Sequence, residues 1–466
     1  MDLGDDEQRA AWRDHLAATV RDRKVIAALA PLAAMTGWVD LLRDAGAQRP
    51  LLVATGIGAG PVPGEQDADI VVVDVPAYAS MTEQLRADDA LARNLPPEVR
   101  AAVRAYDPAG EAVWLVGPFV HTEPIDGRPV LGGRPAAWYA LEDKLLAEDI
   151  WASVGAAHAS ARVVPVDPAA LSRASAELDE GAGVVWAGDA RDGFNGGGDF
   201  TRWVVDARDR AAALAFFAPR CDRVRVMPFL DGVPCSIHGI VLPDGTATFR
   251  PVELAILRGE DRRFVYGGQG TTWDPPADDR VEMRDLARRT GEHLRERVDY
   301  RGAFGIDGIL GRDGFRPTEL NSRSAAGIVT QTQALDSAAF TLLQLSCVAG
   351  HDPGVTVAEL EAWAMPVLDA QRVSRAIGMA PRRVTEVSRT LPVRWDGAHL
   401  TTATEDTADA CVLVGPSGAG TFCRLVSDLL GPGERVGDLN AAMMRFLDAE
   451  LGTGFGPVQV PPDVRS

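Results

Sequence analysis

The chain has 466 residues, a formal net charge of −19 and the apolar content of an ordinary globular protein. At about 150 residues per domain it has room for roughly three domains. The negative charge disfavours binding to nucleic acid or to an anionic membrane surface, because both need a basic patch. No apolar run reaches the roughly 18 residues of a membrane span, and the acidic residues 1–6 are not typical of a signal peptide.

The numbers and spacing of cysteine, histidine and lysine limit the kinds of site that the chain can form. The five cysteines are scattered and form no CxxC motif, which predicts reduced thiols and a cytoplasmic protein. The seven histidines lie far apart without an HExxH motif, so we expect no zinc site. Only Lys24 and Lys144 are lysines among the 47 basic residues. Wherever the chemistry requires a lysine, the chain therefore offers almost no choice.

The first 136 residues predict a small α/β domain. Residues 7–48 read as helical, and apolar runs at residues 50–54, 69–74 and 113–116 read as buried strands. The loop at residues 56–60 contains three glycines but has Pro61 where a dinucleotide-binding loop needs its third glycine, which argues against NAD. We expect this loop, with Gly58 at its centre, to line a substrate site instead.

The remaining residues predict two further parts. Residues 137–352 contain a glycine-rich segment, strands from 223 to 273, a helix at 278–298, a hairpin at 303–321 and a helix at 335–349. Residues 353–466 predict a C-terminal α/β extension with a strand at 410–414 and helices near 421–430 and 437–450. Residues 415–421 resemble a phosphate-binding loop but lack its lysine, so they predict only a tight strand-to-helix turn.

The hairpin carries the most chemical information. The turn Gly311-Arg312-Asp313-Gly314 separates two strand-like runs, and folding the chain there brings Asp307 nearly opposite Glu319. Side chains alternate along a strand, so Asn321 shares the face of Glu319. Three oxygen donors then converge, which is a set that suits Mg²⁺.

These residues resemble a known family. The pattern Gly-Ile-Asp, a short turn and Glu-Leu-Asn-Ser-Arg at residues 305–323 is similar to the metal-binding hairpin of ATP-grasp enzymes. The resemblance implies that Asp307, Glu319 and Asn321 hold Mg²⁺ against ATP, and that Arg323 steadies an acyl phosphate or the tetrahedral intermediate formed from it. It also implies an α/β (α+β) ATP-grasp fold. In that fold a pre-ATP-grasp domain precedes a central domain with lobes at 137–226 and 227–352.

The same resemblance assigns the upstream ATP-binding parts. Lys144 takes the place of a lysine that contacts phosphate or adenine, and Gly193, Gly196, Gly197 and Gly198 form a flap over the phosphates. A second lysine expected on the strand before the flap is absent. Arg191 and Arg202 are both candidates to replace it, and the sequence does not decide between them.

The next strand resembles the adenine hinge of the family. Met227, Pro228, Phe229 and Leu230 are expected to meet the adenine, and Asp231 the ribose. Farther along the chain, Arg258 is a candidate catalytic cation, and Glu253 and His238 are candidate substrate contacts.

The combined expectation is an ATP-dependent ligase that joins a carboxylate to an amine through an acyl phosphate, with ATP and Mg²⁺ as cofactors. Small-molecule substrates such as amino acids or peptides are expected as partners, without nucleic acid or membrane, and a homodimer is a candidate assembly. The chain also resembles pheganomycin-type peptide ligases, which implies a role in natural-product peptide biosynthesis. Two alternatives stay open: an ATP-grasp enzyme with a non-amine nucleophile, and a nucleotide-binding regulator without turnover.

Overall fold

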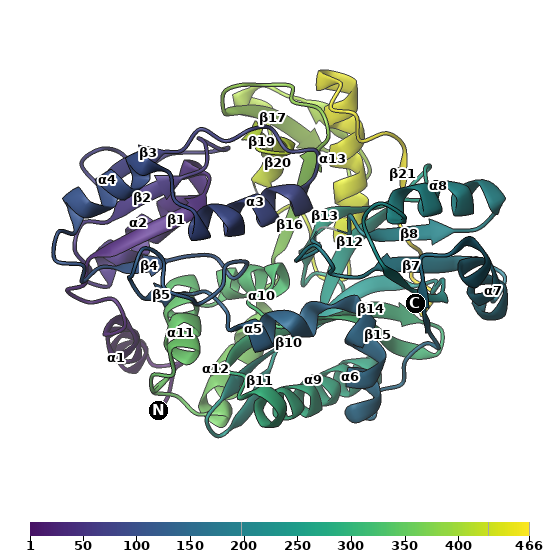
Figure 1. Ribbon diagram of the computed structural model, residues 1–466, viewed down its shortest axis with the longest axis horizontal. Coiled ribbons are helices and arrows are strands. Elements are labelled where there is room, and N and C mark those ends of the chain that lie inside the picture. Colours follow the sequence, from purple (N-terminus) through teal and green to yellow (C-terminus); the bar gives the residue numbers. More distant parts are fainter. Residues whose placement is uncertain (197, 427, 466) are drawn as a thin grey trace.

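Three β-sheets organise the computed structural model, which describes residues 1–196, 198–426 and 428–465 (Figure 1). The first is parallel, in the order β3-β2-β1-β4-β5. Helices α2 and α4 lie beside this sheet, whereas α3 lies between it and the rest of the molecule (Figure 1). The elements of this part are α1 (Asp6–Ala17), β1 (Val25–Ala30), α2 (Leu32–Asp44), β2 (Leu51–Ala54), β3 (Asp69–Val72), α3 (Met81–Arg93), α4 (Pro97–Tyr106), β4 (Val113–Leu115) and β5 (Val130–Leu131).

The structure corrects the prediction of a continuous helical region at residues 7–48. The central strand β1 lies between α1 and α2, and its residues from Val25 to Leu29 are buried. A short apolar run of this kind has no polar face, so its periodicity cannot separate a buried strand from a helix. Pro31 follows β1 and caps α2.

A four-stranded antiparallel sheet in the order β6-β9-β7-β8 forms the second layer. Helices α7 and α8 lie beside it at the right of Figure 1. Apolar side chains of β7, β9 and both helices form one core cluster. The elements are α5 (Ala136–Tyr139), α6 (Ala147–Ser153), β6 (Arg162–Pro165), α7 (Pro168–Leu178), β7 (Val184–Gly188), β8 (Thr201–Val204), α8 (Ala207–Phe217) and β9 (Arg223–Pro228).

The third sheet contains twelve strands among the described residues and runs from the hairpin to the C-terminal part. Its main path is β15-β14-β10-β12-β13-β16-β20-β19-β17-β18, with β11 beside β10 and β21 beside β12. The strands are β10 (Val233–Leu242), β11 (Gly245–Thr248), β12 (Val252–Gly259), β13 (Phe264–Gly270), β14 (Gly302–Gly311), β15 (Gly314–Asn321), β16 (Ser374–Ala380), β17 (Arg389–Trp395), β18 (Leu400–Thr402), β19 (Ala410–Ser417), β20 (Gly420–Val426) and β21 (Val458–Gln459).

Helices cover this large sheet. Helix α9 packs against β10 and β11, and α13 against β12, β13 and β16. The helices are α9 (Ala277–Val298), α10 (Ala326–Gln331), α11 (Ser337–Ala349), α12 (Val357–Ala370) and α13 (Val436–Leu451). The predicted helices at 278–298, 335–349 and 437–450 are confirmed. No helix among the described residues is long and apolar enough to cross a membrane.

The predicted helix at 421–430 is wrong. Residues 420–426 form β20, an antiparallel partner of β19, so the glycine-rich turn before it joins two strands. Burial alternates along β20, with Thr421, Cys423 and Leu425 buried between half-buried residues, as period-two strands require. Gly420 has φ of +126°, and an added Cβ would lie 2.0 Å from the Ala380 carbonyl oxygen, so this turn needs glycine.

Candidate functional site

The hairpin β14–β15 brings the predicted oxygen donors together. Asp307 and Glu319 face each other directly in the strand register, which confirms that part of the prediction. Asn321 donates from Nδ2 to Asp307 Oδ2 at 2.9 Å and accepts at Oδ1 from Arg323 Nη2 at 2.6 Å. Burial, together with repulsion from Glu319, raises the pKa of Asp307 to about 6. The negative charges of Asp307 and Glu319 therefore repel each other, and Arg323 offsets part of this repulsion.

Two cations reach the same place from outside the hairpin. Lys144 pairs with Glu319. Arg225 on β9 pairs with Glu148 and donates from Nη1 to the Thr318 carbonyl oxygen at 3.2 Å. Both side chains are largely buried. The carboxylates of the hairpin thus lie within a cationic rim, which is an arrangement suited to a polyanionic ligand.

A cavity of about 360 Å³ lies above the hairpin, a size typical of a small-molecule site. It joins the hairpin, the four-stranded sheet and the glycine-rich loop. Apolar side chains form one group of lining residues: Val185, Met227, Phe229, Leu230, Leu254, Ile256 and Phe264. Charged and amide side chains form the other group: Lys144, Asn195, Arg225, Asp307, Glu319, Asn321 and Arg323.

Arg225 is a charged lining residue that the sequence analysis did not predict. It pairs in register with Ala187 on β7, the strand on which a second lysine is expected, and both residues line the cavity. Arg191 and Arg202 are not among the lining residues. Arg191 pairs with Asp192 and Asp222, and the guanidinium of Arg202 lies 3.8 Å from the ring centroid of Phe216. Strand alternation was the signal that could have found it, because Arg225 lies on the same strand face as the predicted hinge residue Met227.

The hinge residues divide into two groups. Met227, Phe229 and Leu230 line the cavity, whereas Pro228 and Asp231 do not. Asp231 accepts from Arg258 Nη2 at 2.6 Å, and the Arg258 guanidinium lies 4.8 Å from the centroid of Phe229. Arg258 therefore contacts the hinge and is not among the residues that line the cavity, and its role as a catalytic cation stays a prediction.

Glu253 also lies outside the cavity. It is fully buried and accepts from Arg435 Nε and from the backbone N–H of Val436, each at 2.7 Å, at the start of α13. A carboxylate with these partners anchors a helix N-terminus. The expectation of a substrate contact at Glu253 is therefore wrong: its neighbour Leu254, on the other face of β12, lines the cavity.

His238 lines the cavity as a buried, neutral group. Its Nε2 lies 3.2 Å from Ser236 Oγ, and its Nδ1 lies 3.4 Å from Gln331 Nε2. Burial and the nearby Arg323 lower its pKa to about 3. An added Cβ at Gly327 would lie only 2.3 Å from the imidazole ring. The surrounding chain therefore fixes this ring and keeps it uncharged.

The predicted glycine positions have different surroundings. Gly196 and Gly198 line the cavity, Gly193 does not, and Gly197 lies outside the described residues. Gly58 does not line it either. With φ of +79°, Gly58 packs so closely that an added Cβ would lie 2.7 Å from Pro31 Cβ. The structure therefore gives Gly58 a packing role between the end of β1 and the start of α2.

Comparison with known proteins rests on structure. No protein-family model matches the chain, and no curated protein matches it in sequence. The biotin carboxylase domain of a Hydrogenobacter thermophilus 2-oxoglutarate carboxylase, solved with MgADP and bicarbonate, superposes with a TM-score of 0.56 at 12% identity. The match covers 86% of this chain and 85% of that one.

Two further solved structures match over nearly their whole length. Carboxyaminoimidazole ribonucleotide synthase of Aspergillus clavatus, solved with ATP, gives a TM-score of 0.52 at 12% identity, covering 92% of this chain and 99% of that one. An L-amino acid ligase of Bacillus licheniformis gives 0.51 at 13% identity, covering 92% and 98%. With its parallel sheet, its large antiparallel sheet and these neighbours, the chain has the ATP-grasp fold.

Proposed function

We propose that the protein is an ATP-dependent ligase that joins a substrate carboxylate to an amine. The observation that carries the proposal is one cavity that combines an apolar slot with the facing carboxylates of Asp307 and Glu319 and a cationic rim. Apolar walls suit a purine, and the charged end suits a triphosphate with its metal ion. The ligases among the structural neighbours support the same reading.

In this proposal the adenine lies between the cavity-lining side chains of β9, β12 and β13. Met227 and Phe229 approach it from β9 and the segment after it, and Leu254 and Ile256 come from β12. The triphosphate then extends toward Lys144 and Arg225, below the glycine-rich loop. Arg225 takes the role expected of the missing lysine, and its guanidinium offers a fork of donors to phosphate oxygens.

Mg²⁺ fits the hairpin by the chemistry of its donors. Two carboxylates and one amide oxygen on adjacent strands form a hard oxygen set. The ammonium group of Lys144 already contacts Glu319, so this carboxylate is placed to receive a cation. Asp307, Glu319 and Asn321 would hold the ion, which supplies neutralisation of the phosphate charge when it is bound.

The proposed reaction proceeds in two steps. A carboxylate oxygen attacks the γ-phosphorus, the bond to the β-phosphate oxygen breaks, and ADP leaves. The amine then attacks the carbonyl carbon of the acyl phosphate, and inorganic phosphate leaves with the electrons of the broken C–O bond. Arg323 is placed to bind the oxyanion, because Asn321 and Glu142 hold its guanidinium beside the cavity.

The finer assignments belong to the same proposal. We infer an amino acid or peptide as substrate, a peptide or amide product of natural-product biosynthesis, a cytoplasmic location and a possible homodimer. The proposed domain limits lie at residues 136 and 352. Arg225 argues against the alternative of a regulator without turnover, since it offers a cation beside the strand on which the lysine is expected. The bicarbonate bound by one neighbour keeps a different carboxylate substrate in view.

The test is release of ADP from MgATP in a screen of amino acids and short peptides. We expect turnover only when a carboxylate and an amine are both present, with one amide formed per ADP. A protein that binds MgATP but shows no substrate-dependent ADP release would overturn the ligase assignment. Turnover with a carboxylate and a thiol, or with bicarbonate, would replace the amine or carboxylate assignment.

A further inference from the structure

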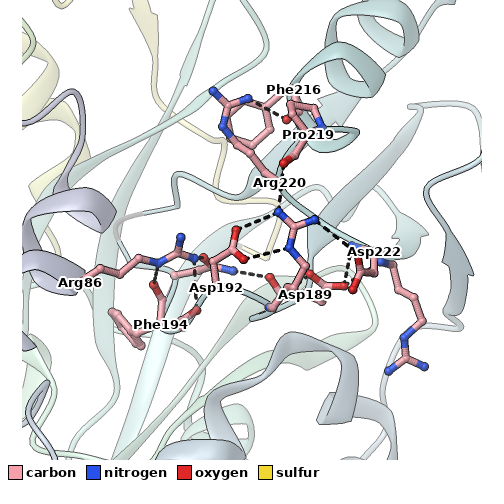
Figure 2. Close-up of polar contacts among 12 residues, drawn as sticks. Arg86, Asp189, Asp192, Phe194, Phe216, Pro219, Arg220 and Asp222 are labelled. Atoms are coloured by element: carbon pink, nitrogen blue, oxygen red, sulfur yellow. Dashed lines mark hydrogen bonds and ion pairs between the residues drawn. The ribbon is translucent and has the colours of Figure 1, made fainter. Parts of the chain in front are cut away.

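The glycine-rich loop is attached at its two ends to different parts of the molecule. At its start, Asp189 accepts from the backbone N–H of Asp222 at 3.0 Å and of Arg223 at 2.7 Å, so this end belongs to the four-stranded sheet. Figure 2 shows Asp189, Asp192 and Asp222 on that side, while Arg86 reaches Phe194 from α3 on the other. The second half of the loop thus depends on a helix of the N-terminal part.

Helix α3 contacts the loop through two residues one turn apart. Arg86 donates from Nε to the Phe194 carbonyl oxygen at 2.9 Å and from Nη2 to Gly193 O at 3.2 Å and Asn195 Oδ1 at 2.5 Å. The hydroxyl of Thr82 lies 3.1 Å from both the N and the O of Gly196. Residues at i and i+4 share a helix face, so α3 presents one continuous edge to the loop.

The loop segment held by Arg86 contains Phe194, which lies close to Arg323, the proposed catalytic arginine. Phe194 is buried, and its ring centroid lies 5.0 Å from that of Phe119 and 6.0 Å from that of Tyr139. The guanidinium carbon of Arg323 lies 4.9 Å from the Phe119 ring and 5.7 Å from the Phe194 ring. Two phenyl rings, one from the loop and one from the segment after β4, therefore make cation–π contacts with this guanidinium.

We propose that Arg86 is a positioning residue that latches the glycine-rich loop shut over the nucleotide and holds Phe194 against Arg323. This inference rests on the proposed function. Three hydrogen bonds from one charged guanidinium fix the carbonyl and amide oxygens of consecutive loop residues. The latch holds the loop against the cavity, where it shields the acyl phosphate from water. It also makes closure of the ATP site depend on the N-terminal part of the chain.

The experiment follows hydrogen–deuterium exchange of residues 190–200 with and without the probe Mg²⁺ and AMP-PNP. We expect the nucleotide to protect the wild-type loop. In Arg86→Gln we expect that protection to fall about tenfold, since each hydrogen bond to a charged group is substantial. Arg86→Lys keeps the charge but loses the fork, so its protection should be intermediate. Arg100→Gln on α4 is the matched arginine control and should match the wild type.

Activity gives an independent readout. With MgATP and no other substrate, Arg86→Gln should hydrolyse ATP to ADP faster than the wild type. A purely structural loss would instead lower the rates of hydrolysis and ligation together. Thr82→Val removes the second contact at nearly constant volume and serves if Arg86→Gln does not fold. The latch is overturned if Arg86→Gln, Arg86→Lys and Thr82→Val all keep the wild-type protection and none hydrolyses ATP faster than the wild type. Failure of the wild type to bind Mg²⁺ and AMP-PNP overturns the proposed function itself.

Discussion

The two ends of the candidate ATP site are built in different ways. The oxygen donors stand on β14 and β15, and β14 is paired along both edges, with β10 and with β15. The glycine-rich loop lies outside any sheet and relies on side-chain contacts with α3 and with the start of β9. A metal ion needs fixed ligands, whereas a cover over a nucleotide has to open. One end is therefore fixed by backbone pairing in the sheet, and the other is held by side-chain hydrogen bonds.

The largest effect is expected at the end formed by the hairpin. Glu319→Ala removes one of two facing carboxylates, so ADP-forming activity should fall by about 100-fold or more, which corresponds to several kcal/mol of lost charge stabilisation. Steady-state ADP release measures it. Glu282→Ala, an exposed glutamate beside the hairpin turn, should leave activity unchanged. Full activity in Glu319→Ala would remove the metal site from the proposal.

The next effect concerns the cation opposite the hairpin. Arg225→Gln should raise the KM for ATP about tenfold, the size of one charge-assisted hydrogen bond, while Arg225→Lys should change it less. Because Arg225 also pairs with Glu148, Glu148→Gln is the control for a broken ion pair. If Glu148→Gln and Arg225→Gln raised the KM equally, Arg225 would act through packing and not through phosphate.

The dependence of stability on pH tests whether burial keeps His238 uncharged in the folded protein. Its pKa is about 3 in the folded protein and about 6.5 when unfolded, so the unfolded chain binds the extra proton. This contribution to stability is present above pH 6.5 and is lost as the pH falls toward 3. In His238→Gln, the fall in unfolding free energy between pH 6 and 4 should shrink by up to about 1.4 kcal/mol per pH unit. Urea denaturation measures the unfolding free energy at each pH. An equal fall in both proteins between pH 6 and 4 would show that this imidazole gains its proton in the folded state as readily as in the unfolded state.

The smallest effects are expected for the two arginines outside the cavity. Arg191 lies at the base of the glycine-rich loop, paired with Asp192 and Asp222, and Arg202 stacks on Phe216. Neither side chain lines the cavity, so Arg191→Gln and Arg202→Gln should alter the KM for ATP by less than about threefold. A tenfold rise in either variant would reassign the phosphate contact from Arg225.

The sequence predicted the hairpin best because its information is local. A four-residue turn between alternating strands sets the register of Asp307 and Glu319 without any knowledge of the rest. Arg225 shares a strand face with Met227, but only the pairing of β9 with β7 brings it beside the strand on which the second lysine is expected. Glu253 was misassigned because alternation gives two faces but does not say which one meets the cavity. In β1, a short apolar run fits a helix as well as a strand.

The long sheet has a consequence for any shortened form of the chain. Strand β13 pairs with β16 through residues 268–270, and Asn440 donates to the carbonyl oxygen of Ile377 at 2.8 Å beside this junction. Removal of everything after residue 352 would strip β13 of this neighbour and leave unpaired backbone groups along an open edge. Such edges recruit other chains into intermolecular sheets. By covering this edge, the C-terminal part therefore protects the rest of the large sheet from aggregation.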